Sequence, residues 1–383
     1  MTVVATDGLM PCDVLVEGDR IAGFAERGAP DSDGWQRIDG QGRYLYPGMI
    51  DLLQHGMGEH LYGDAEQGAV QAASEKLLAH GTTGFLPSIG CLSPDATGPT
   101  LTELARQCRL ADGARAIGLH SEGPCFGMPG AHNPENVARP SVGLAEHLIE
   151  ASDGLLRAVT LAPELPEAEK FARRLARDGV SVHLGHSKAP PEEVPRYLDW
   201  GINAVTHVYN VLPDPEPDGS GVHKLSLIDA VMAERGLALG VVADGIHTHP
   251  RLLAILAQLP ADRVFLETDA MKFAGTPGME FEFYPGYWVR SAPGKAVRDR
   301  NGGLCGSSLT PDEAMRNYMK MGGADLVQAS HATSLVPARV LGMEDDMGSI
   351  APGKLADFVL LDADTLAVEV TVIGGVERYR RTA

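Results

Sequence analysis

Short apolar runs alternate with stretches of helical periodicity along most of this 383-residue chain. Gly and Pro bound the apolar runs, as they bound the strands of a parallel sheet. Between them, stretches such as 65–80 and 167–177 repeat apolar residues at helical spacing. We predict eight strands, near 49–53, 84–87, 116–119, 159–162, 180–184, 204–206, 239–243 and 264–268. This pattern predicts an α/β fold, a (β/α)8 TIM-type barrel, with a doubly wound open sheet as the alternative because periodicity cannot prove closure.

The two ends of the chain alternate apolar and polar residues in short pieces. Residues 13–24 do so around Gly18-Asp19, which is typical of a hairpin, and residues 357–362 and 368–375 have the same texture. Neither end can bury a core alone, so we predict that together they form one small β-sandwich. The predicted domains are therefore 1–46 with 348–383 for the sandwich, and 47–347 for the barrel.

One polar residue stands just past each of four predicted strands. Glu122 follows the third strand, His186 the fifth, His207 the sixth and Asp269 the eighth. The C-terminal ends of barrel strands meet at one rim, so we expect these side chains to be neighbours. A carboxylate and two imidazoles suit Zn²⁺, and an additional Asp is available for proton transfer. Each residue alone could be a helix cap or a satisfied polar group, but together they indicate a metal-dependent hydrolase.

Three stretches rich in Gly and Pro interrupt the regular pattern, at 124–140, 212–224 and 272–303. Each follows a strand that carries one of these polar residues. We therefore expect all three to be irregular loops that bind the substrate.

Composition limits the classes of partner. The formal net charge of −19 argues against nucleic acid or an anionic membrane surface as the main partner. The five cysteines form no CxxC pair, so we expect no disulfide framework. The first ten residues lack the basic and apolar regions of a signal peptide, and no apolar run reaches the roughly 18 residues of a membrane span. We expect a cytoplasmic protein with a small-molecule substrate.

Several short motifs carry a family resemblance. They are Pro-Gly-Met-Ile-Asp at 47–51, Ser-Glu-Gly-Pro at 121–124, Gly-Ala-His-Asn-Pro at 130–134, Thr-Leu-Ala-Pro-Glu at 160–164, Gly-His-Ser at 185–187, Thr-His-Val-Tyr-Asn at 206–210, Ala-Asp-Gly-Ile-His at 243–247, Thr-Asp-Ala at 268–270, Gly-Ser-Ser at 306–308 and Gly-Ser-Ile-Ala-Pro-Gly-Lys at 348–354. Each motif is weak alone. As a set they make the chain resemble the N-acetylglucosamine-6-phosphate deacetylase family of the amidohydrolase superfamily.

The resemblance implies a hydrolase that removes the acetyl group from an N-acetylated amino sugar. It implies one divalent metal on Glu122, His186 and His207, with Zn²⁺ favoured and Fe²⁺, Mn²⁺ or Co²⁺ also compatible with these ligands. Asp269 would take a proton from water and return it to the departing amine. His132 would polarise the acetyl carbonyl, and capping its own loop is the alternative role for this histidine.

The resemblance also assigns substrate contacts and an assembly. His55, Asn210, Val211 and His247 would contact the N-acetylated sugar. Similar enzymes imply a homodimer whose subunits share the mouth of the active site.

The chain departs from the family pattern at three places. Leu53 replaces the first histidine of a His-x-His pair, leaving His55, so we expect a single metal rather than two. Asp218 stands near the arginine that usually binds the sugar phosphate, and a carboxylate there repels a phosphate dianion. Ser121 and Cys125 replace bulkier apolar residues around the Glu-Gly-Pro turn.

Two other functions stay open. One is a deacylase for an unphosphorylated or otherwise modified N-acyl substrate, which the altered phosphate loop favours. The other, of a different class, is a non-catalytic barrel that only binds a sugar. A proton-transfer residue such as Asp269 argues against the second, because a binding protein has no use for one.

Overall fold

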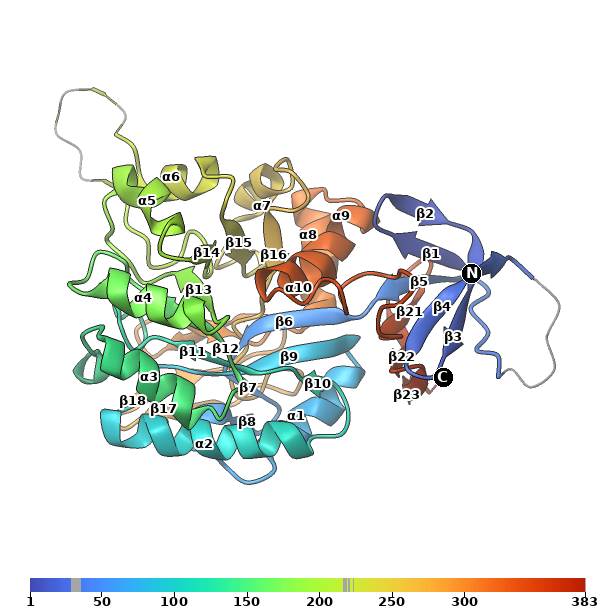
Figure 1. Ribbon diagram of the computed structural model, residues 1–383, viewed down its shortest axis with the longest axis horizontal. Helices are drawn as coiled ribbons and strands as arrows, with labels where there is room; N and C mark the ends of the chain where they lie inside the picture. The colour runs from blue at the N-terminus through green and yellow to red at the C-terminus, as the bar shows by residue number, and fades with distance from the viewer. Residues whose placement is uncertain (29–35, 216–218, 220, 223, 383) are drawn as a thin grey trace.

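The computed structural model describes residues 1–28, 36–215, 219, 221–222 and 224–382. Eight parallel strands pair in chain order to form a ring (Figure 1). The ring closes where the Asp269 amide donates to the Leu53 carbonyl at 2.9 Å and the His55 amide donates to the Ala270 carbonyl at 2.8 Å. The predicted α/β barrel is confirmed and the open sheet is excluded. The strands are β6 (Met49–Gln54), β9 (Thr82–Ile89), β11 (Leu119–Glu122), β12 (Leu156–Leu161), β13 (Ser181–Leu184), β14 (Ile202–Val205), β15 (Ala238–Val241) and β16 (Val264–Leu266).

The third strand differs from its predicted bounds. It is interrupted, with β10 (Arg115–Ala116) and β11 both pairing with β9. At Gly118, in the break, a Cβ atom would lie 2.7 Å from the Leu155 carbonyl oxygen, so only glycine lets the two chains approach this closely. As a result, Glu122 is the last residue of β11 rather than a residue beyond the strand.

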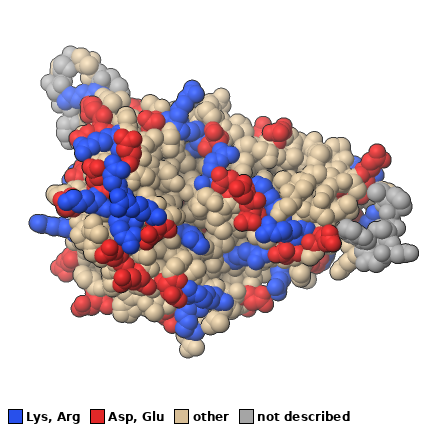
Figure 2. Space-filling view, in the orientation of Figure 1, with Lys and Arg blue, Asp and Glu red and all other residues tan. Residues whose placement is uncertain are grey.

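Helices cover the outside of the ring. Helix α4 shows why they form, because its buried residues Ala168, Phe171, Ala172 and Leu175 recur at helical spacing along one face. Basic and acidic side chains lie interspersed on the solvent side of this region (Figure 2). None of the helices in the described part of the chain is long and apolar enough to span a membrane. The helices are α1 (Ala69–Leu78), α2 (Pro94–Leu110), α3 (Val142–Ala151), α4 (Ala168–Arg177), α5 (Val194–Leu198), α6 (Leu227–Ala233), α7 (Pro250–Leu256), α8 (Pro311–Gly322), α9 (Leu326–Ser330) and α10 (Val336–Val340).

The two chain ends build the small domain predicted for them. A six-stranded sheet in the order β2-β1-β5-β21-β22-β23 combines strands from both ends, and both termini lie in this domain (Figure 1). The β3–β4 hairpin packs on it through a core that includes Val3, Ile21, Leu45, Phe358 and Val372. The exact division of the chain into domains stays a proposal. The strands are β1 (Thr2–Ala5), β2 (Gly8–Met10), β3 (Cys12–Glu17), β4 (Arg20–Glu26), β5 (Arg43–Pro47), β21 (Phe358–Asp362), β22 (Val368–Ile373) and β23 (Val376–Arg380).

The expectation that residues 272–303 form an irregular loop is wrong. This stretch belongs to a four-stranded antiparallel sheet inserted after β16. Its strands form because Phe281 and Val289 point into a small apolar core with Leu61 and Met271. The strands are β17 (Glu280–Tyr284), β18 (Tyr287–Arg290), β19 (Ala296–Asp299) and β20 (Leu304–Ser307).

A partly buried ion-pair network, centred on the buried Asp312, joins α8 to the end of α1. His80 Nδ1 donates to Asp312 Oδ1 at 2.9 Å, Thr310 Oγ1 donates to it at 2.7 Å, and Arg316 donates to Oδ2 at 2.8 Å. Burial of Asp312 opposes its charge, but the hydrogen bond and charge of His80 and the charge of Arg316 outweigh burial and hold its pKa at about 2.

Asp312→Asn should therefore destabilise the protein by about 2 kcal/mol at pH 7. Because the folded-state pKa is depressed, this stability is present above the unfolded pKa, roughly 3.9, and is lost as pH falls toward about 2. Urea denaturation of both proteins from pH 7 to pH 3 should show the difference shrinking below roughly pH 4. The exposed Asp364→Asn is the control, and an equal effect of the two substitutions would contradict the assignment.

Candidate metal and active site

The four polar residues predicted from the strand ends meet at the C-terminal rim of the barrel. Glu122 ends β11, while His186, His207 and Asp269 lie two or three residues past β13, β14 and β16. The last three have left-handed backbones, with φ of 51°, 31° and 50°. Such conformations cost roughly 1–3 kcal/mol each in ordinary residues and cluster at functional sites. Here they turn the chain sharply at the strand ends, and all four residues are buried.

One oxygen of Glu122 lies between the rings of two histidines. Glu122 Oε1 is 3.1 Å from His186 Nε2 and 3.0 Å from His207 Nε2, and the two nitrogens are 3.2 Å apart. Atoms that ligate a tetrahedral cation at about 2.0–2.1 Å lie roughly 3.3 Å from one another. These three atoms therefore have the spacing of a ligand set.

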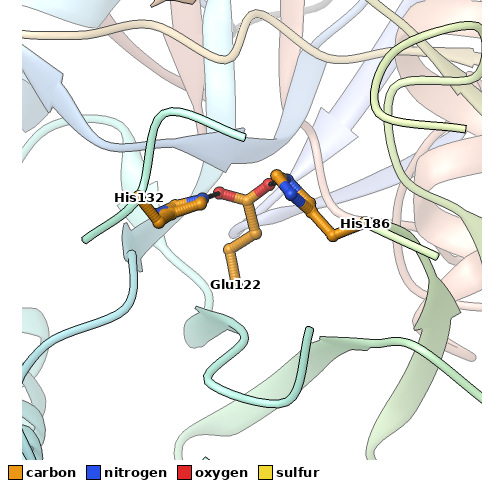
Figure 3. Close-up of side chains that lie close together, drawn as sticks. All are labelled: Glu122, His132 and His186. Atoms are coloured by element: carbon orange, nitrogen blue, oxygen red, sulfur yellow. Dashed lines mark hydrogen bonds and ion pairs between the residues drawn. The ribbon is translucent and has the colours of Figure 1, made fainter. Parts of the chain in front are cut away.

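The other oxygen of Glu122 faces a second pair of histidines. Oε2 is 2.9 Å from His55 Nε2 and 3.0 Å from His132 Nε2. Figure 3 shows the carboxylate between the rings of His132 and His186, which together form a compact group of possible metal ligands. Asp269 Oδ1 lies 3.5 Å from His55 Nε2. Either pair of histidines, His186 with His207 or His55 with His132, could therefore supply metal ligands beside Glu122.

Backbone hydrogen bonds distinguish one histidine of each set, His186 and His132, through the tautomers they impose. His186 Nδ1 donates to the Met128 carbonyl at 2.8 Å, so neutral His186 presents a bare Nε2 lone pair to Glu122. His132 Nδ1 instead accepts from the Cys91 amide at 3.3 Å, so its Nε2 carries the proton and donates to Glu122. His186 has the form of a metal ligand, and His132 has the form of a hydrogen-bond donor.

The electrostatics of the site call for a cation beside Glu122 Oε1. Burial lowers the pKa of His186 to about 4 although Glu122 opposes this, so at neutral pH its lone pair faces a carboxylate oxygen. Burial also lowers the pKa of His207, but Glu122, Asp269 and Glu267 outweigh it and raise that pKa to about 9. A divalent cation would bind the lone pair of His186 and offset the negative charge around His207. The residues present therefore fit a metal.

Glu267, which the sequence analysis did not single out, holds the backbone of the proposed ligand His207. Its Oε1 accepts the backbone N–H of His207 at 2.5 Å, and it is buried against Gly240, where a Cβ atom would lie 2.4 Å from that oxygen. Burial raises the pKa of Glu267 to about 8, although the neighbouring His207 opposes this. Alternation along Phe265, Glu267 and Asp269 was the available signal, because every second residue faces the barrel interior.

A cavity of about 170 Å³ opens above these residues. Its lining includes every residue predicted to contact the substrate, namely His55, Asn210, Val211 and His247. His247 Nδ1 donates to Asp244 Oδ2 at 2.7 Å, which holds the imidazole in place. Among the described residues no lysine or arginine lines the cavity.

Six other residues line the cavity. Ala131 and Phe283 come from stretches that the sequence analysis took as irregular, and the others lie just outside those stretches, namely Met271, Leu304, Cys305 and Gly306. The described positions at which the chain departs from the family pattern do not line the cavity. Leu53 is buried and binds Asp269 through its carbonyl, while Ser121 and Cys125 are buried and do not line the cavity. Asp218 lies outside the described residues.

The barrel and its rim of carboxylates and imidazoles define an amidohydrolase, and the amidohydrolase family matches residues 44–378. The chain is 32% identical to the N-acetylgalactosamine-6-phosphate deacetylase of Escherichia coli O157:H7, covering 88% of both chains. It is also 32% identical to the human N-acetylglucosamine-6-phosphate deacetylase, covering 95% of this chain and 90% of that one. Within the amidohydrolases, the chain belongs to the N-acetylglucosamine-6-phosphate deacetylase family.

Solved structures agree with this assignment. N-acetyl-D-glucosamine-6-phosphate deacetylase from Mycobacterium smegmatis superposes with a TM-score of 0.87 at 26% identity and covers 98% of both chains. A mutant of the Mycobacterium smegmatis enzyme, solved in complex with N-acetyl-D-glucosamine-6-phosphate, superposes with a TM-score of 0.88 at 25% identity and covers 98% of this chain and 97% of that one.

Proposed function

We propose that this protein is a metal-dependent hydrolase that removes the acetyl group from an N-acetylated amino sugar. The observation that carries the proposal is the shared carboxylate of Glu122. One oxygen joins a ligand pair, His186 and His207, while the other accepts from the donor His132. A divalent cation held by the first set would supply Lewis acidity toward water and the amide carbonyl, and the donor set suits Zn²⁺.

The side chains around this set can move the protons that amide hydrolysis requires. Burial raises the pKa of Asp269, and Glu122 adds to this while His55 opposes it. A carboxylate with a raised pKa is a better base at neutral pH and, once protonated, a ready acid. Asp269 accepts a proton from the attacking water and returns it to the departing amine. In the free protein the Nε2–H of His132 donates to Glu122, and with substrate bound it would donate instead to the carbonyl oxygen, where negative charge develops.

Sequence identity to the relatives does not indicate which N-acetylhexosamine is the substrate. Relatives named for N-acetylgalactosamine 6-phosphate and for N-acetylglucosamine 6-phosphate are equally identical to this chain, at 32%. An N-acetylhexosamine 6-phosphate is therefore the first candidate substrate. An uncharged N-acyl sugar is the second, because no lysine or arginine lines the described part of the cavity.

Acetate release tests the proposal. Metal-loaded protein should release acetate from N-acetylhexosamines, activity should disappear on chelation, and elemental analysis should find one metal per chain. Two metals per chain, each needed for activity, would contradict the single-metal assignment. A protein that binds these sugars without releasing acetate would be the non-catalytic barrel.

Phosphate discrimination should be weak. Because Asp218 stands near the position of the arginine expected from the family pattern, kcat/KM for the 6-phosphate sugar should exceed that for the free sugar by no more than about tenfold. Asp218→Arg should raise this ratio, whereas Asp214→Arg, with the same charge change in the same loop, should raise it less. A wild-type preference of about 10³, equivalent to roughly 4 kcal/mol, would show that another cation binds the phosphate.

A further inference from the structure

A second cavity lies behind the histidines of the proposed site. Its volume is about 60 Å³, and it shares His55, His132 and Phe283 with the main cavity. Its remaining wall includes Leu61 and Leu92. Leu61 lies in the short hairpin after β6, formed by β7 (Gly56–Met57) and β8 (His60–Leu61), and Leu92 lies on the loop that follows β9. Asn210 and His247, by contrast, line only the main cavity. The histidines of the proposed site therefore border two cavities.

The proposed chemistry assigns a different part of the substrate to each side. The departing nitrogen must lie near Asp269, which among the described residues lines the main cavity and not the second one. The carbonyl oxygen must lie near His132, which lines both. The acyl substituent is the remaining group on the carbonyl carbon, so it points away from Asp269 and toward the second cavity.

The second cavity is larger than a methyl group requires. A cavity of roughly 10–15 Å³ is enough for one water-sized group, and this cavity of about 60 Å³ is larger than that. Its wall is also suited to hydrocarbon. Leu61 and Cys91 are buried, and burial raises the pKa of the Cys91 thiol, which stays neutral. The rest of the lining consists of three polar residues, Asp64, Asn133 and Tyr284, and two glycines, Gly63 and Gly90.

We propose that this cavity is an acyl subsite that admits uncharged N-acyl groups longer than acetyl, such as propionyl and butyryl. The inference rests on the proposed function, because it assumes that the amide carbonyl sits at His132. It adds a specificity for the acyl group to the proposed specificity for the sugar. Asp64 would repel acyl chains that end in a carboxylate.

A series of N-acetyl, N-propionyl and N-butyryl derivatives of one amino sugar tests the proposal. Each methylene that enters an apolar subsite should raise kcat/KM by roughly fourfold. A fall of more than about tenfold from acetyl to propionyl would overturn the proposal, because it would mean that the site ends at the methyl group.

Two substitutions change the volume of the subsite in opposite directions. Leu92→Phe should lower the butyryl-to-acetyl ratio at least about tenfold, and Leu92→Ala should raise it. Leu304→Phe is the matched control, because Leu304 lines only the main cavity and its enlargement should affect all three substrates by the same factor. A change of the ratio in Leu304→Phe but not in Leu92→Phe would place the acyl group in the main cavity.

Binding separates this inference from the proposed function. The same three sugars are titrated calorimetrically into metal-loaded Asp269→Asn protein, where affinity should rise with acyl length and Leu92→Phe should abolish the rise. If affinity rises but the wild-type protein releases no acid from any sugar, the subsite stands and the proposed hydrolysis fails. Affinity that stays the same or falls as the acyl group lengthens overturns the subsite.

Discussion

Asp269→Asn should lower turnover by roughly 10²–10⁴-fold while the metal stays bound, the usual scale of general acid–base catalysis. Asparagine keeps the size of the side chain and cannot accept the proton of water or return it to an amine. The side chain is buried beside His55, and no ligand atom of the proposed metal set belongs to it. Steady-state kinetics of acetate release together with elemental analysis of the same sample measure both quantities.

The control for this substitution lies just before the same strand. Asp262 precedes β16 on the exposed surface, so Asp262→Asn should leave turnover within about twofold. Turnover near the wild-type value in Asp269→Asn, with metal present, would remove Asp269 from the mechanism. Loss of metal together with activity would instead make Asp269 a metal ligand.

The barrel could be predicted because its strands are buried on both faces. Such strands read as continuous apolar runs, as in β15 (Ala238–Val241) and β16 (Val264–Leu266), and these runs are visible without knowledge of their partners. The candidate ligands could be predicted for a related reason. Residues at the ends of parallel strands share one rim, so Glu122 and His207 become neighbours although 85 positions separate them.

Other parts of the site depend on contacts that no local pattern encodes. His132 comes from the loop after β11, and its approach to the second oxygen of Glu122 depends on how that loop folds over the rim. Its tautomer depends on the Cys91 amide, which lies 41 positions away. Cys305 reaches the cavity because strands of an inserted sheet return to the barrel mouth. That sheet was missed because its short strands lie between Gly and Pro residues that are typical of loops.

Assembly stays a prediction for a different reason. The homodimer that the family resemblance implies concerns a surface shared with a second copy, whereas packing within one chain determines the barrel and its rim. The same distinction applies to the phosphate. The residue at position 218 can be compared with a family pattern from the sequence, but the discrimination it produces is a difference between two binding free energies, which only substrate kinetics measures.

His186→Ala should release the metal, whereas His132→Ala should retain it, although both rings touch Glu122. His186 offers a bare nitrogen to the cation, so its removal should leave no metal bound after gel filtration. His132 offers an N–H to Glu122, and loss of such a supporting contact usually costs about 10–100-fold in metal affinity. Turnover of metal-saturated His132→Ala should fall by roughly 10²–10³-fold, and His132→Gln, which keeps an N–H donor, should recover part of it. Equal loss of metal from both alanine variants would instead place the cation among Glu122, His132 and His186.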